Sequence, residues 1–116
     1  MKQFIIDRDT WARGPRKNYR LKDDSGQCCL FGQILSQCGV PDALLLDYSY
    51  PDTLFVENPE YSYTRLGLPD IYHLDVITVM QINDMSGADE IRERKLTKEF
   101  ARFGIEIVFV GGGDGV

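Results

Sequence analysis

Residues 25–41 read SGQCCLFGQILSQCGVP, and the rest of the chain is expected to fold around this stretch. Ser25 has the side chain of a helix N-cap, and Gly39 followed by Pro41 is typical of a helix end. Between these ends, the 100° steps of a helix place four side chains on one apolar stripe: Phe31, Ile34, Leu35 and Cys38. The stretch therefore predicts an amphipathic helix that buries one face.

All three cysteines of the chain lie in this stretch. Cys38 falls on the apolar stripe and is expected in the core, whereas Cys29 is expected to be the more exposed thiol. Cys28 is expected in the first helical turn, where the helix dipole favours a thiolate. An odd number of cysteines in a short chain without a secretory signal favours free thiols in a reducing compartment.

The composition is that of one globular domain. The chain has 116 residues, of which 43% are hydrophobic and 27% charged. No run approaches the roughly 20 apolar residues that a membrane span needs. We expect a single α+β domain at residues 1–110 and a flexible glycine-rich tail at 111–116. The expected location is the cytoplasm, with no membrane contact and no cofactor.

The net charge of −5 is unevenly distributed. Residues 1–22 carry seven basic and two acidic side chains, a balance of +5, whereas the other 94 residues carry six basic and sixteen acidic ones, a balance of −10. The acidic bulk argues against general nucleic-acid binding. The basic N-terminal segment either pairs with the protein's own acidic surface, which we favour, or receives a phosphate-bearing ligand or an acidic partner.

Three short segments favour β-structure. Residues 105–110 are strong strand formers and are expected to pair with residues 3–6. Residues 19–22 alternate between apolar and polar side chains and predict a further strand. The expected sheet is therefore small, with about three strands, and packs against two or three helices.

The remaining helices are expected in three places. Residues 42–47 predict one or two helical turns, and residues 71–85 fit both a helix and a strand, of which we favour the helix. Ser86 predicts the cap of a final helix that ends at Gly104. The expected buried face of that helix consists of Ile91, Leu96, Phe100 and Phe103.

The segment from Tyr48 to Tyr72 has no sustained period and predicts a long irregular loop. It contains five of the six tyrosines and three prolines. Because tyrosine combines a large apolar ring with a polar tip, it is a favoured interface residue. These rings either form a binding surface or cover the core, and the sequence leaves both open. The tyrosines proposed for binding are Tyr48, Tyr50, Tyr61 and Tyr63.

Several blocks of the chain resemble a group of small uncharacterised proteins from bacteria and their phages. The blocks are CCLFG at 28–32 with the Cys38-Gly39 pair, IND at 82–84, and the closing residues from Phe100 to Val110. The opening from Ile5 to Gly14 is similar too. The resemblance implies no particular activity and assigns no functional residues, but it implies an origin in a phage or mobile element.

One enzymatic alternative follows from Gly26-Gln27-Cys28 at the start of the expected helix. This segment is similar to the active-site segment of transglutaminases and some papain-like enzymes, whose thiol lies at a helix N-terminus. His73 would then be the base, oriented by Asp75 or Asp84. Those enzymes usually need a larger scaffold, so we do not expect an enzyme. The cysteine spacing does not favour a metal site either.

Two binding hypotheses remain. In the first, which we favour, the acidic surface imitates nucleic acid and binds a basic host protein, with the tyrosines as anchors. In the second, the basic segment holds the phosphates of a small nucleotide while Trp11 or a tyrosine stacks on its base. The cations proposed for the second hypothesis are Arg13, Arg16, Lys17 and Arg20.

Overall fold

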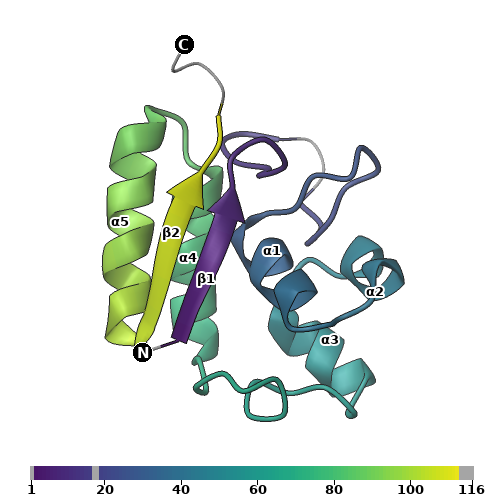
Figure 1. The fold of residues 1–116 in the computed structure, drawn as a ribbon. Helices are drawn as coiled ribbons and strands as arrows, with labels where there is room; N and C mark the ends of the chain where they lie inside the picture. The colour runs from purple at the N-terminus through teal and green to yellow at the C-terminus, as the bar shows by residue number, and fades with distance from the viewer. Residues whose placement is uncertain (1, 17–18, 113–116) are drawn as a thin grey trace.

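The computed structural model describes residues 2–16 and 19–112, which form two parallel strands in front of a group of five helices (Figure 1). The elements in chain order are β1 (Lys2–Asp7), α1 (Leu30–Gln37), α2 (Asp42–Asp47), α3 (Pro51–Glu57), α4 (His73–Asp84), α5 (Asp89–Arg102) and β2 (Ile105–Val110). The predicted α+β class is confirmed, but the sheet has two strands in the described residues rather than about three.

The first and last elements of the chain pair with each other, as the sequence predicts. β1 and β2 run parallel, with Phe4 opposite Ile107 and Ile5 opposite Val108. Because side chains alternate along a strand, Phe4 and Ile107 point into the core while Ile5 faces solvent. The core therefore lies on one side of the sheet, against α1, α4 and α5.

The prediction of a strand at residues 19–22 is wrong. Only Lys22 makes a bridge, to Cys28, and it stands alone. The backbone of this segment is used elsewhere, because Leu21 N donates to Tyr48 O at 2.7 Å and Lys22 N donates to Leu45 O at 3.0 Å. The segment thus ties α2 to the start of α1 and does not extend the sheet.

The cysteine helix begins later than the sequence predicts. α1 starts at Leu30, and its N-cap is Cys29, whose sulfur accepts a hydrogen bond from Gly32 N at 3.4 Å. Ser25 is not a cap, because Asp23 takes its hydroxyl and its backbone N–H in a preceding turn. Cys29 therefore points into the core and is fully buried, opposite to the expectation.

The end of α1 agrees with the sequence. Gly39 adopts a φ of +95°, the left-handed conformation that a side chain would strain. Ile34 and Leu35 are buried as predicted, while Cys38 is only partly buried. All three cysteines are free thiols.

The expected irregular loop contains a helix that the sequence pattern missed. α3 begins with Pro51 at its first position, where the fixed φ of proline suits a helix and the missing N–H costs nothing. Leu54 is fully buried and fastens this helix to the core. Residues 58–72 remain irregular.

The last two helices confirm the helical choice for residues 71–85 and correct two details. α5 has Ala88 as its N-cap with no side-chain bond, so the predicted cap at Ser86 is wrong. Leu96 and Phe100 are fully buried, but Ile91 is exposed. None of the described helices is long and apolar enough to cross a bilayer. Most of the predicted tail, residues 113–116, lies outside the described residues.

Candidate functional site: an acidic face around His73

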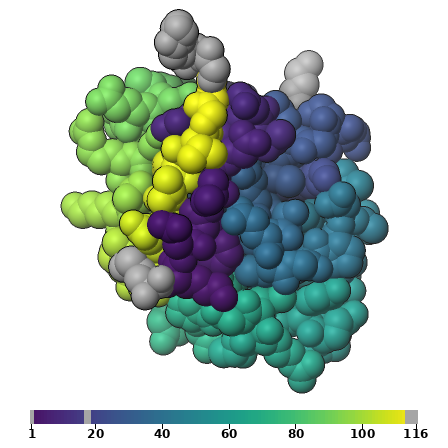
Figure 2. All heavy atoms as spheres, in the orientation of Figure 1, coloured from purple at the N-terminus to yellow at the C-terminus, as the bar shows by residue number. Residues whose placement is uncertain are grey.

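Residues 42–75, here called the acidic segment, contain seven carboxylates and a single basic side chain, Arg65. They fold as α2, α3, the irregular connection and the first turn of α4. Figures 1 and 2 show α3 and that connection at one end of the molecule, away from the tip of the sheet. Seven carboxylates against one arginine give this region a local balance of −6.

Asp52, in the first turn of α3, holds this segment together with both of its carboxylate oxygens. The Tyr63 hydroxyl donates to Oδ1 at 3.1 Å, and His73 Nδ1 lies 2.5 Å from Oδ2. Tyr63 is buried, whereas the side chain of His73 is 61% exposed. Asp52 thus fixes the orientation of an imidazole ring that faces solvent.

One aromatic ring contacts this imidazole, and its two neighbours in sequence are large exposed side chains. The Tyr50 ring meets the His73 ring edge to face, with 6.2 Å between centroids. Tyr72 and Leu74, on either side of His73 in sequence, are 79% and 77% exposed. We call Tyr50, Asp52, Tyr72, His73 and Leu74 the His73 patch.

The charges around the patch are only partly neutralised. Asp42 pairs with Lys22 and Asp75 lies 3.9 Å from Arg102. Four other exposed carboxylates of the segment have no ion pair within the described part of the chain: Asp47, Glu57, Glu60 and Asp70. Burial, together with the charge of Asp52, raises the pKa of the Tyr63 hydroxyl, which therefore stays protonated and donates to the carboxylate.

The four tyrosines that the sequence proposed for binding have different positions. Tyr48 bonds to Glu57 at 2.8 Å, and Glu57 raises the pKa of the Tyr48 hydroxyl. Tyr61 packs on the core and Tyr63 is buried. Only Tyr50 is exposed and belongs to the patch. Tyr72 and Leu74 were missed, because they can be recognised as outward-facing only once the buried face of α4 is known.

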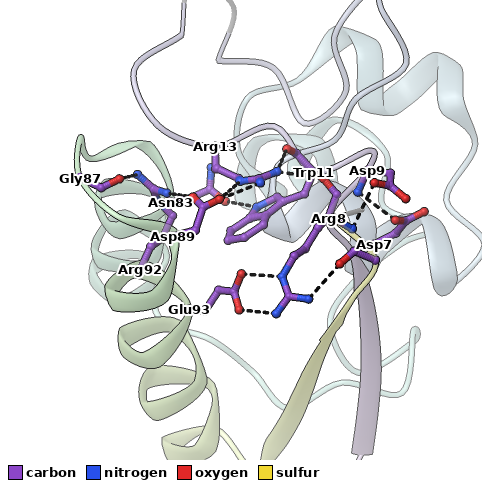
Figure 3. Close-up of polar contacts among 12 residues, drawn as sticks. Asp7, Arg8, Asp9, Trp11, Arg13, Asn83, Gly87, Asp89, Arg92 and Glu93 are labelled. Atoms are coloured by element: carbon purple, nitrogen blue, oxygen red, sulfur yellow. Dashed lines mark hydrogen bonds and ion pairs between the residues drawn. The ribbon is translucent and has the colours of Figure 1, made fainter. Parts of the chain in front are cut away.

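The basic N-terminal segment pairs with the protein's own carboxylates, as we favoured from the sequence. Arg8 contacts Glu93 at 2.7 Å, and Arg13 contacts Asp89 at 2.8 Å (Figure 3). Arg16 contacts Asp84 at 2.9 Å. Arg20 donates to the carbonyl of Leu46 at 3.0 Å, and Lys17 lies outside the described residues.

Trp11 belongs to the interior. Its side chain is 2% exposed, and its Nε1 donates to Asn83 Oδ1 at 2.8 Å. The Arg13 guanidinium lies 4.7 Å from the centre of its ring, and the Phe109 ring packs 4.9 Å away. No face of this ring is available to a nucleotide base.

Cys28 lines a hollow of about 370 Å³ with Lys22, Asp7 and Gln33. Burial raises the pKa of its thiol, although the nearby charge of Lys22 opposes this effect. Burial also raises the pKa of the Cys29 thiol, to about 11. Neither sulfur therefore has the depressed pKa that distinguishes a nucleophilic cysteine.

The structure does not bring Cys28 together with His73. Leu30, two residues after Cys28, donates its backbone N–H to Asn83 near the C-terminal end of α4. His73 begins the same helix ten residues earlier, about 15 Å away along the axis. Its carboxylate partner is Asp52, and the proposed orienting residues are bound to arginines. The geometry does not favour the cysteine-nucleophile alternative.

Within the described ranges, no group of three or more His, Cys, Asp or Glu side chains could hold a metal ion. No family model, curated protein or solved structure matches the chain. The function must therefore be argued from the geometry of the His73 patch and its charged surroundings.

Proposed function

We propose that this protein acts by binding a basic protein through the acidic segment, with the His73 patch at the centre of the contact. The observation that carries this proposal is the exposure of Tyr72 and Leu74, the sequence neighbours of a histidine whose imidazole is held by Asp52. Exposing such large side chains to water is unfavourable, and covering them with a partner lowers the free energy of the complex.

The patch has the properties of an interface centre. Aromatic side chains contribute most to binding when a rigid scaffold already holds them in place. Tyr50 and His73 are held in this way, by their mutual ring contact and by Asp52. Tyr72 adds a large ring at the start of α4, whose first turn cannot move without disturbing the Asp52 contact.

The charge of the surroundings indicates the chemistry of the partner. Asp47, Glu60 and Asp70 raise the local negative potential, so a partner rich in lysine and arginine is attracted and a nucleic acid is repelled. The origin implied by the sequence resemblance makes a host protein the expected partner, bound by a surface that replaces its nucleic acid. The nucleotide alternative has no support from the described contacts, because Trp11 is buried and Arg13 and Arg16 are ion-paired.

The experiment is an affinity capture from a bacterial lysate with three forms of the protein. Wild type is expected to retain one stoichiometric partner of basic composition, and added salt is expected to weaken retention. The double variant Tyr72→Ala/Leu74→Ala is expected to lose at least about tenfold in affinity, equivalent to about 1.4 kcal/mol.

The matched control is Ile91→Ala, which removes an exposed apolar side chain on α5, outside the patch. It is expected to bind like wild type. Circular dichroism should show that all forms are folded. Equal retention of the partner by the double variant, or a partner whose binding does not respond to salt, contradicts the proposal.

A further inference from the structure

The two edges of the sheet are not equivalent, and one of them is closed by side chains. Gln33 Oε1 accepts from Asp7 N at 2.8 Å while its Nε2 donates to Asp7 O at 2.9 Å. Gln37, one turn later on α1, makes the same two contacts with Ile5, at 3.4 Å to the N and 2.7 Å to the O. One helical turn matches the two-residue repeat of a strand, at about 6 Å each. The amides thus occupy the edge of β1 as a neighbouring strand would.

The opposite edge, on β2, lacks such partners. Arg8 N donates to Val110 O, which shows that the backbone groups of Val110 face β1. Because a strand alternates, the N–H and C=O groups of Ile107 and Phe109 face away from β1. Among the described residues, no backbone or side-chain group bonds to them, so these groups are left to water.

The element that flanks this edge is α5, which packs against β2 (Figure 1). Glu93 on α5 is held beside β2 by Arg8, whose guanidinium also lies over the Phe109 ring. Thr97 and Ala101 follow Glu93 on the same face of α5, at steps of four residues, and both are exposed and small. Neither side chain is long enough to take the place of the glutamines that close the other edge.

The outer face of the sheet is also uncovered. Figure 2 shows β1 and β2 running across the front of the molecule with no element over them. Ile5 is 51% exposed there, and its cross-strand partner Val108 is half-buried. Parallel sheets in proteins normally have both faces covered. An unpaired edge therefore lies next to an uncovered face on which Ile5 and Val108 are exposed or half-buried.

We propose that a second copy of this chain adds to the sheet through β2, antiparallel, which gives a four-stranded sheet with the order β1-β2-β2-β1. A strand that pairs with itself about a twofold axis offers the same groups from both sides. Glu106 is the one charged side chain of β2. Antiparallel self-pairing centred on Ile107 or Val108 places Glu106 opposite a valine, so the two carboxylates do not oppose each other.

Six residues of strand bury less surface than the about 1,200 Å² of a stable interface. The dimer is therefore weak and depends on concentration. This inference does not rest on the acidic segment, which lies at another part of the molecule and stays exposed in the dimer.

The first test is the mass of the protein in solution, by sedimentation equilibrium over a wide concentration range. Wild type is expected to pass from monomer to dimer as the concentration rises. Val108→Glu sets carboxylates against each other in both registers: opposite Glu106 when the pairing is centred on Ile107, and opposite the same substituted position when it is centred on Val108. This variant is expected to weaken the dimer at least about tenfold. The matched control is Ile5→Glu, which lies directly opposite Val108 on the same face but beside the closed edge, and it is expected to dimerise like wild type.

The second test uses amide hydrogen exchange and needs no variant. As the dimer forms, exchange at Ile107 and Phe109 is expected to slow, while Ile5 and Asp7, which already bond to glutamines, keep their rates. A wild type that stays monomeric overturns the proposal, as does a dimer that both glutamate variants form equally. Protection at Ile107 that appears only when a different protein is added overturns it as well.

Discussion

Two polar side chains link distant parts of this protein, and they do so in opposite surroundings. Asn83, near the end of α4, is fully buried and accepts from Trp11 Nε1 and from Leu30 N, while it donates to the Ala12 carbonyl at 3.0 Å. Asp52, at the start of α3, is partly exposed and binds the side chains of Tyr63 and His73.

The difference between them separates a structural role from a binding role. Asn83 bonds to the backbone of Ala12, within the basic N-terminal segment, and of Leu30, which follows that segment. Figure 3 shows Asn83 close to Trp11, Arg13 and Arg92. Every group around it is buried or ion-paired. Asp52 instead holds rings whose outer faces meet solvent. A buried polar group whose hydrogen bonds are all made within the protein specifies the fold. A polar group at the surface leaves the side chains that it holds available to a partner.

The largest effect on stability is expected from a side chain placed where α1 packs against the backbone of Leu21. Gly32 lies in α1, and a Cβ built on it comes within 1.9 Å of the Leu21 carbonyl oxygen. Because that atom belongs to the backbone, Gly32→Ala is expected to cost more than about 4 kcal/mol despite the better helix propensity of alanine. Urea denaturation measures this, with Ser36→Ala on the exposed side of α1 as the control. A stability equal to that of the control contradicts the packing described for α1.

The comparison itself is tested by removing each central side chain in turn. Asn83→Ala leaves the Trp11 and Leu30 N–H groups and the Ala12 carbonyl buried without partners, so a loss of about 3 kcal/mol or more is expected. Asp52→Ala frees groups that water can reach more easily, and a loss of about 1 kcal/mol is expected. Thermal and urea unfolding of both variants give the two values. Equal losses would mean that the Asp52 region is as structural as the Asn83 region.

The smallest effect concerns acid stability. The hydrogen bond from Arg13 holds the pKa of the Asp89 carboxyl below its usual value of 3.8, and burial opposes this only in part. A carboxyl whose pKa is lower in the folded state stabilises the protein above its unfolded pKa, and that contribution disappears as the pH falls through the folded value. Asp89→Asn is thus expected to cost under about 1 kcal/mol at neutral pH, since the group is partly screened by solvent.

The measurement is urea unfolding of wild type and Asp89→Asn at several pH values. The difference between them is expected to be constant above the unfolded pKa and to shrink below it. Glu90→Gln is the control, because Glu90 is an exposed neighbour whose pair with Arg94 is long, at 3.4 Å. A difference that grows as the pH falls is the opposite sign and excludes the assigned role of Asp89.

Much of the fold could be predicted because its signals are local. The strands at residues 3–6 and 105–110 have strong β-propensity, and Gly39 and Gly104 mark helix ends through a conformation that other residues avoid. The predicted N-cap of α1 is wrong for a different reason. The hydroxyl of Ser25 donates to the nearby Asp23 carboxylate, and the N-cap of the helix is Cys29, four residues after Ser25.

The candidate site could be predicted only in part. The charge imbalance indicated that the basic segment pairs internally, and the tyrosines lie in the segment to which the interface is proposed to belong. The partner of His73 was missed, because Asp52 lies 21 residues away on a helix that begins at proline and has no long periodic pattern. Tyr72 and Leu74 have no local signal for exposure.

The amino-acid sequence by itself determined which segments become strands or helices at the two ends of the chain, and that the net negative charge lies after residue 22. These properties depend on neighbouring residues and on simple sums. Only the tertiary structure decided that Cys29 is buried, that Gln33 and Gln37 close one edge of the sheet, and that Asp52 meets His73. Each of these contacts joins residues whose separation in space depends on how all the elements pack, and no local pattern encodes that distance.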